Sequence, residues 1–193
     1  MNNVIFSHGN GFPASTYRSF TNDLSRRGFK VSSIEKFGHD PLFPVTSNWP
    51  YLVQELADFA KKSADQTGSK PYLIGHSLGG LLSLMCASKH PDLTAGVVLL
   101  DSPVVGGWKA SALNLVKKTN WIGSVSPGRI SKSRRQHWPN IEAVIEHFQH
   151  KRAFSHWHPD ALRDYAEFGT RIENGERVLS FDRVIETAIY NTL

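Results

Sequence analysis

The chain has 193 residues, of which 40% are hydrophobic and 20% are charged, and a formal net charge of +5. This length and composition are typical of one globular unit with a sizeable core, and they exclude a disordered or fibrous chain. The longest apolar stretches, such as residues 95–100, are too short to cross a membrane, and residues 1–3 lead into no secretory segment. We therefore expect a cytoplasmic protein without a membrane span.

Strand and helix patterns alternate through the first hundred residues. Apolar, β-rich runs predict strands at residues 4–7, 29–34, 72–75 and 96–100. Helical periodicity predicts helices at residues 14–27, 48–66 and 78–89; for the second of these, Ser47 or Asn48 is the expected cap and Gly68 the expected end. This order predicts the α/β class, a parallel sheet with helices on both faces, and a substrate site at the carboxyl ends of the strands.

The third predicted strand runs into Gly75-His76-Ser77-Leu78-Gly79-Gly80, and a helical pattern follows at once. Gly-x-Ser-x-Gly between a strand and a helix is the pattern of a nucleophile elbow, in which small residues permit a bend that exposes the serine hydroxyl. The alternative is a flexible loop that matches the pattern by chance. The flanking strand and helix favour the elbow.

A nucleophilic serine needs N–H donors for the oxyanion that forms on the attacked carbonyl. In an elbow these are the backbone N–H after the serine, here that of Leu78, and one from the loop after an earlier strand. The loop after the first strand reads His8-Gly9-Asn10-Gly11-Phe12-Pro13. Asn10 is the first choice for the second donor, with Gly11 or Phe12 as alternatives. The other reading is that the glycines only permit a turn.

The two motifs, together with Val97-Val98-Leu99-Leu100-Asp101, resemble the α/β-hydrolase superfamily, in particular its serine esterases, lipases and thioesterases. The resemblance is specific over the first half of the chain. It implies an α/β-hydrolase core at 1–103 and, after the sixth strand of the family, a helical cap at 104–193. Helices are expected there at residues 108–120, 140–152 and 159–169. The scattered tryptophans of this region either line an acyl pocket or pack the cap on the core.

The resemblance also implies a triad in the chain order serine, acid, histidine. Asp101 is the candidate acid, with a capping role in the turn at residues 101–103 as the alternative. The family carries its histidine after the last strand, and we expect the C-terminal strands to be absent from this chain. The histidines at positions 137, 147, 150, 156 and 158 are candidates without family support.

Two other readings of the second half carry less weight. His147, His150, His156 and His158 have no H-E-x-x-H pattern, so we expect no metal. A stretch free of acidic residues carries seven basic ones, but no nucleic-acid motif accompanies them, so we expect a solvated face: Lys109, Lys117, Lys118, Arg129, Lys132, Arg134 and Arg135. The single Cys86 is expected in the core.

These patterns predict a serine hydrolase that cleaves a carboxylic ester or related acyl bond through an acyl-enzyme on Ser77, without a cofactor. One alternative is a catalytically impaired hydrolase-fold binding protein, because the histidine is missing. Another is a carbon–carbon bond hydrolase or a perhydrolase on the same scaffold. The expected partner is a small acyl substrate; a homo-oligomer or a complementing C-terminal fragment is also considered.

Overall fold

Four parallel strands form the central sheet of the computed structural model, which describes residues 2–103 and 134–192. The strands are β1 (Asn2–Ser7), β2 (Phe29–Ser33), β3 (Tyr72–His76) and β4 (Gly96–Leu100), in the order β2-β1-β3-β4. Every neighbouring pair is parallel. The predicted α/β class and parallel sheet are therefore confirmed, and the carboxyl ends of β1, β3 and β4 lie at one edge.

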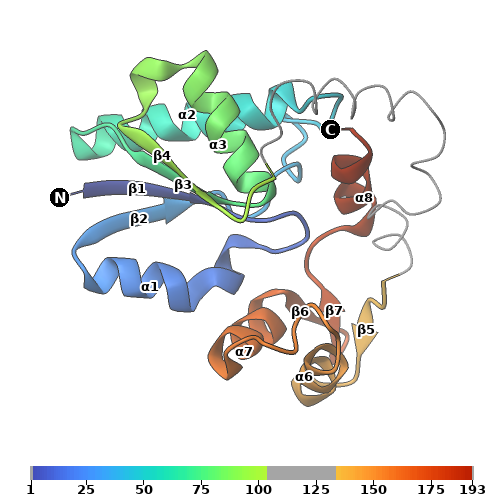
Figure 1. The fold of residues 1–193 in the computed structure, drawn as a ribbon. Helices are drawn as coiled ribbons and strands as arrows, with labels where there is room; N and C mark the ends of the chain where they lie inside the picture. The colour runs from blue at the N-terminus through green and yellow to red at the C-terminus, as the bar shows by residue number, and fades with distance from the viewer. Residues whose placement is uncertain (1, 104–133, 193) are drawn as a thin grey trace.

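Helices cover both faces of this sheet. Figure 1 shows α2 (Pro50–Thr67) and α3 (Leu78–Lys89) on one face and α1 (Arg18–Arg26) on the other. Short 3-10 turns, η1 (Ala14–Tyr17) and η2 (Pro91–Leu93), precede α1 and follow α3. The three predicted helices are present, with η1 and α1 together occupying residues 14–26.

The start of α2 differs from the prediction. Asn48 and Trp49 have φ values of 57° and 53°, and neither Ser47 nor Asn48 caps the helix, which begins at Pro50. The Trp49 indole N–H instead donates to the carbonyl of Ile189 and to Thr192 Oγ1, at 3.2 and 2.9 Å. The start of the helix is thus held by a contact with a residue 140 positions later in the chain, which the local sequence does not show. Gly68 ends the helix with φ 69°, as expected.

The main core lies between the sheet and α2 and α3. Its buried residues include Ile5, Leu56, Leu73 and Leu82, and Phe181 and Ile189 from the end of the chain join the same cluster. Cys86 is fully buried among them, and burial raises the pKa of its thiol to about 11. Its predicted place in the core is confirmed.

Residues 134–192 form three helices and a small antiparallel sheet. The elements are β5 (His137–Trp138), α6 (Ile141–Gln149), α7 (Pro159–Phe168), β6 (Thr170–Glu173), β7 (Glu176–Leu179) and α8 (Arg183–Asn191). The helices predicted at residues 140–152 and 159–169 are confirmed as α6 and α7, whereas the one predicted at 108–120 lies outside the described residues. The three strands and α8 were not predicted.

The hairpin of β6 and β7 has a sequence signal that periodicity alone does not reveal. Asn174 and Gly175 join the strands with φ values of 50° and 81°. Asn-Gly is the preferred pair for a two-residue hairpin turn with positive φ at both positions. The dipeptide between Ile172 and Val178 could therefore have predicted the hairpin.

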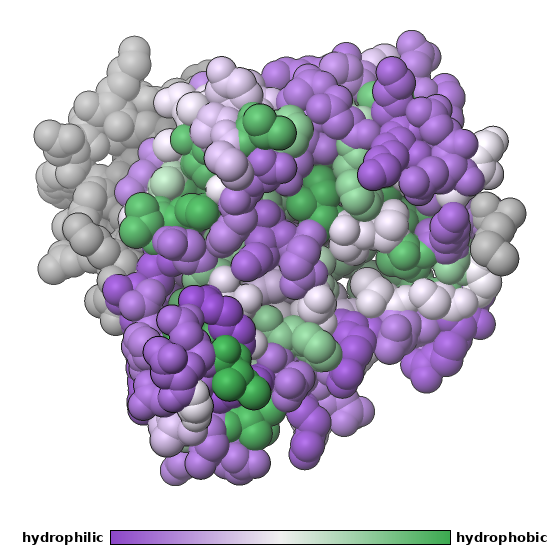
Figure 2. Space-filling model, turned by 180° about the vertical axis from the view of Figure 1, so that it is seen from behind, coloured by the Kyte–Doolittle hydropathy of each residue, from purple (hydrophilic) through white to green (hydrophobic). Residues whose placement is uncertain are grey.

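The edge of the main sheet presents apolar side chains. On the face in Figure 2, hydrophobic residues form separate patches between hydrophilic ones. Val98 and Leu99 of β4, which ends the strand order, are 43% and 37% exposed.

Within residues 2–103 and 134–192, no helix combines the length and apolar character that a membrane span needs.

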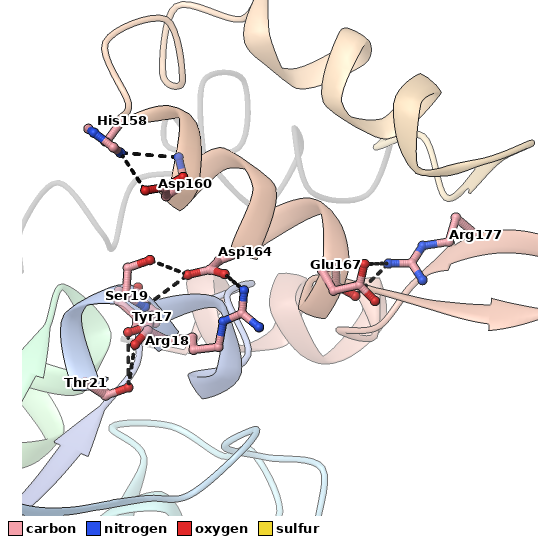
Figure 3. A network of polar contacts seen from close by, with 9 residues as sticks. All are labelled: Tyr17, Arg18, Ser19, Thr21, His158, Asp160, Asp164, Glu167 and Arg177. Carbon is pink, nitrogen blue, oxygen red and sulfur yellow. Dashed lines mark hydrogen bonds and ion pairs between the residues drawn. The ribbon is translucent and has the colours of Figure 1, made fainter. Parts of the chain in front are cut away.

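A buried carboxylate joins α7 to the start of α1. Asp164 is 2% exposed, and its Oδ2 accepts hydrogen bonds from the backbone N–H and the hydroxyl of Ser19, at 3.0 and 2.5 Å. Its Oδ1 lies 2.6 Å from the Arg18 guanidinium, and Figure 3 shows the three side chains converging. The N–H groups of a first helical turn have no partner within the helix, and the Asp164 carboxylate accepts from one of them. Its negative charge also interacts favourably with the positive end of the helix dipole.

Candidate active site

Ser77 stands at the bend between β3 and α3. Its φ and ψ are 50° and −113°, a combination that side-chain-bearing residues rarely adopt, and its N–H donates to the Leu100 carbonyl at 3.0 Å. A Cβ on Gly75 would lie 2.2 Å from the backbone of Gly79, and one on Gly79 would lie 2.0 Å from the Ser7 carbonyl oxygen. The two glycines therefore permit the close packing of β1, β3 and α3 on which the bend depends. This backbone is the elbow that the motif predicts.

The loop after β1 is held by its own histidine. Nδ1 of His8 lies 2.8 Å from the Gly9 carbonyl and the N–H of Phe37 donates to Nε2 at 2.9 Å, so the imidazole is neutral with its proton on Nδ1. Complete burial lowers the pKa of His8 from 6.5 to about 4. Both nitrogens are engaged in fixing the loop, which leaves His8 no role as a base.

Tyr17 links this loop to the elbow. Its hydroxyl accepts from the N–H of Gly9 at 3.1 Å and lies 2.7 Å from Nδ1 of His76. Burial lowers the pKa of His76 and raises that of Tyr17, so both are neutral near pH 7. A Cβ on Gly9 would lie 2.8 Å from His76 Nδ1, so a side chain at this position would displace the His76 ring or the Tyr17 hydroxyl.

The predicted nucleophile and both predicted donors line one cavity. Asn10, Ser77 and Leu78 border a space of about 100 Å³, and the remaining walls are apolar or aromatic: Trp49, Leu81, Pro103, Ile189 and Tyr190. In the part of the chain that the structure describes, the backbone N–H groups of Asn10 and Leu78 donate to no carbonyl. Neither N–H group thus has a carbonyl acceptor among these residues, which is a condition that an oxyanion donor must meet.

The other predicted members of a triad are not assembled in residues 2–103 and 134–192. Asp101 follows β4 with φ 45° and an exposed side chain, and its charge opposes the lowering of the pKa of His76. No histidine of these two ranges is hydrogen-bonded to Ser77 Oγ. The role of Asp101 stays a prediction.

The histidines of the second half have local contacts. The ring of His147 packs on Trp138 and Phe148, and His158 Nδ1 accepts from the N–H of Asp160 at the start of α7. No three His, Cys, Asp or Glu residues among those described gather as metal ligands would. Of the basic stretch, only Arg134 and Arg135 are described, and Arg134 is 15% exposed.

Sequence reasoning missed the contribution of α8 to the cavity. The side-chain amide of Asn10 donates to the Glu186 carbonyl at 3.0 Å, and Ile189 and Tyr190 of the same helix line the cavity. Asp182, which caps α8 by accepting from the N–H groups of Val184 and Ile185, was the available signal for the helix. No local pattern indicates that this helix reaches the loop after β1.

Comparison with known proteins places this geometry in a family. The family model described as serine aminopeptidase, S33, matches residues 2–162. Curated relatives include monoglyceride lipase of Rattus norvegicus, 27% identical over 139 residues, which cover 67% of this chain and 46% of that protein. A monoglyceride lipase homolog of monkeypox virus is 27% identical over 135 residues, covering 64% of this chain and 46% of that protein. The chain thus spans less than half the length of these relatives.

Solved structures share the fold. E-2-(acetamidomethylene)succinate hydrolase superposes with a TM-score of 0.70 at 23% identity, covering 98% of this chain and 64% of that one. The thioesterase domain from the curacin biosynthetic pathway has a TM-score of 0.67 at 19% identity, covering 96% and 66%. With the match to residues 2–162, these findings show that the chain belongs to the serine aminopeptidase S33 family of α/β-hydrolases.

Proposed function

We propose that this hydrolase cleaves a carboxylic ester, or a related acyl bond, through an acyl-enzyme on Ser77. The observation that carries the proposal is the cavity in which the bend at Ser77 meets the two residues, Asn10 and Leu78, whose backbone N–H groups have no carbonyl partner among the described residues. The monoglyceride lipases among the relatives support an ester of glycerol as one substrate to test.

In this mechanism Oγ of Ser77 attacks the acyl carbon, and the carbonyl oxygen becomes an oxyanion held by the N–H groups of Asn10 and Leu78. The intermediate collapses, the alcohol leaves with a proton, and the acyl group stays on Oγ. Water then attacks the acyl-enzyme and releases the carboxylic acid. Asp101 is the proposed acid of the triad, which orients the imidazole that takes the serine proton.

A second candidate is a hydrolase-fold protein that binds acyl compounds with little turnover. The observation in its favour is that no described imidazole is hydrogen-bonded to Ser77 Oγ. Without a base, serine hydrolases lose several orders of magnitude in rate, while the oxyanion site alone retains about 10³-fold catalysis over water.

The test is covalent labelling of the chain by a fluorophosphonate probe, with the modified residue located by peptide mass spectrometry. The enzyme proposal expects one adduct on Ser77, no adduct in the matched variant Ser77→Ala, and hydrolysis of p-nitrophenyl acetate and a monoacylglycerol that the variant lacks. An unlabelled Ser77 in folded protein would favour the binding protein.

The cytoplasmic location, self-association and a complementing fragment stay predictions.

A further inference from the structure

A buried ion pair lies directly behind the loop that follows β1. Nη1 of Arg134 is 2.8 Å from both carboxylate oxygens of Glu186, and Nη2 donates to the Tyr165 hydroxyl at 2.6 Å. The side chains of Arg134 and Glu186 are 15% and 5% exposed. Burial raises the pKa of Glu186, but two charge-assisted bonds to a guanidinium oppose that rise, and the geometry is that of an ionised pair.

Both ends of Glu186 contact the loop. Its backbone carbonyl accepts from the Asn10 side-chain amide at 3.0 Å. A Cβ on Gly11, which has φ 80°, would lie 2.7 Å from Oε1 of Glu186 and 3.0 Å from Nη1 of Arg134. The ion pair therefore packs directly against the backbone of Gly11, where a side chain would have to displace it, next to the N–H proposed as an oxyanion donor.

The helix that carries Glu186 is also fixed at its far end. Its Ile189 carbonyl and Thr192 hydroxyl accept from the Trp49 indole, and the Thr192 carbonyl accepts from the N–H of Asn48 at 2.7 Å. Between these two attachments Ile189 and Tyr190 face the cavity at Ser77. A shift of α8 would consequently move both a cavity wall and the support of the loop.

We propose that Arg134 and Glu186 are positioning residues, which hold the Asn10–Gly11 backbone at the place where its N–H meets the oxyanion. The inference rests on the proposed function, because it assigns a role in the same site. An oxyanion donor acts only within hydrogen-bond distance of the charge that develops, and displacements of about 1 Å are known to cost about 100-fold in rate. Neither side chain reaches the cavity, so neither is a catalytic residue.

The first experiment compares Arg134→Met with Arg177→Met in the full chain. Arg177 is a matched control because it is also buried, at 8% exposure, and its partners are Thr170, Ala166 and Glu167 rather than Glu186 or a residue of the loop. For p-nitrophenyl acetate we expect Arg134→Met to lower kcat at least about tenfold with KM changed less than about threefold, and Arg177→Met to change kcat less than about twofold. An unchanged kcat, or equal losses in both variants, would overturn the proposal.

Glu186→Gln keeps the shape of the side chain and serves if Arg134→Met does not fold. We expect its kcat to fall below that of wild type, by less than the tenfold expected for Arg134→Met, with KM unchanged, because one acceptor for Arg134 remains. A kcat equal to that of wild type would count against a positioning role.

A second readout needs no turnover and separates this inference from the proposed function. Amide hydrogen exchange at Gly9 and Phe12, whose N–H groups donate to the Tyr17 hydroxyl and the Gly9 carbonyl, should be at least about tenfold faster in Arg134→Met or Glu186→Gln than in wild type, and unchanged in Arg177→Met. If Ser77 is not labelled and no ester is cleaved, the proposed function fails, while faster exchange still supports the structural part. If Ser77 is labelled and the enzyme is active but the exchange rates of the variants are unchanged, the positioning role fails and the proposed function stands.

Discussion

Ser77 and its neighbouring glycines carry the strain of the site. A residue with a side chain in the backbone conformation of Ser77 costs about 1–3 kcal/mol, and such outliers persist only where the surroundings determine them. The surroundings here are Gly75 and Gly79, whose missing side chains let β1, β3 and α3 approach. Asp101, with φ 45°, is a second such position at the same edge of the sheet.

Gly79→Ala tests this packing. Helix propensity favours alanine over glycine by about 0.5–1 kcal/mol, so an open helical position would be stabilised. At Gly79 the added Cβ would lie 2.0 Å from the Ser7 carbonyl oxygen, a backbone atom that cannot turn aside. We expect a loss of at least about 3 kcal/mol in the free energy of unfolding, measured by urea denaturation, and loss of phosphonate labelling.

Gly28→Ala is the control for backbone conformation alone. Gly28 has φ 88° but nothing within 4 Å of an added Cβ, so its cost should be only about 1–2 kcal/mol. A larger loss at Gly28 than at Gly79 would contradict the steric account of the elbow.

At the scale of elements, the contact between α7 and α1 ties the second half of the chain to the first. Asp164→Ala would leave the N–H of Ser19 and the guanidinium of Arg18 without their buried partner. We expect a loss of about 2 kcal/mol in unfolding free energy, less than for a fully buried pair because Arg18 is 52% exposed. Thermal or urea unfolding measures it.

Asp160→Ala, on the same helix, provides the comparison. The carboxylate of Asp160 is 75% exposed, so the change should stay within about 0.5 kcal/mol. Equal losses from the two variants would mean that helix charge, rather than the buried contact, determines the effect.

The elements themselves could be predicted unevenly. The four strands and three α-helices of residues 2–100 could be predicted because each has a clear hydrophobic period and ends at a turn-forming residue, as the run at residues 72–75 does at its glycine. The hairpin of β6 and β7 was not predicted, because the family resemblance implies a helical cap in this region. Asn174-Gly175 is nevertheless a local signal for a two-residue hairpin turn. The strand β5 has two residues and owes its existence to pairing with β7, which no local pattern shows.

At the scale of the whole molecule, a buried histidine and a partly buried glutamate give stability opposite dependences on pH. The pKa of His8 is lowered to about 4, so between pH 6.5 and 4 the unfolded chain binds a proton that the folded chain does not, and stability falls on acidification by about 3 kcal/mol. Burial raises the pKa of Glu55 to about 7, so the folded chain holds a proton between pH 4.5 and 7 and stability falls as pH rises through that window. The two trends offset each other.

Glu55→Gln should separate the trends. Without the Glu55 carboxyl, the free energy of unfolding should fall more steeply between pH 7 and 4.5 than in wild type, because a contribution that opposes the histidines is removed. Burial lowers the pKa values of His39 and His76 as well, and these act in the same direction as His8. Urea unfolding at pH 7, 5.5 and 4.5 measures both slopes; parallel curves for variant and wild type would refute the assignment to Glu55.

The sequence by itself determined the α/β class, the parallel sheet, the bend at Ser77 and the turn-rich loop after β1 that carries Asn10. These follow from local causes, namely the hydrophobic period, the positions of glycine and the order of strands and helices, all of which can be read within a few residues. Only the tertiary structure decided what surrounds them: Tyr17 between Gly9 and His76, and α8 with Glu186 and Arg134 behind Asn10. The amide of Asn10 and the carbonyl of Glu186 are 176 residues apart in the chain, and such a contact arises from packing of whole elements, which leaves no periodic trace in the sequence.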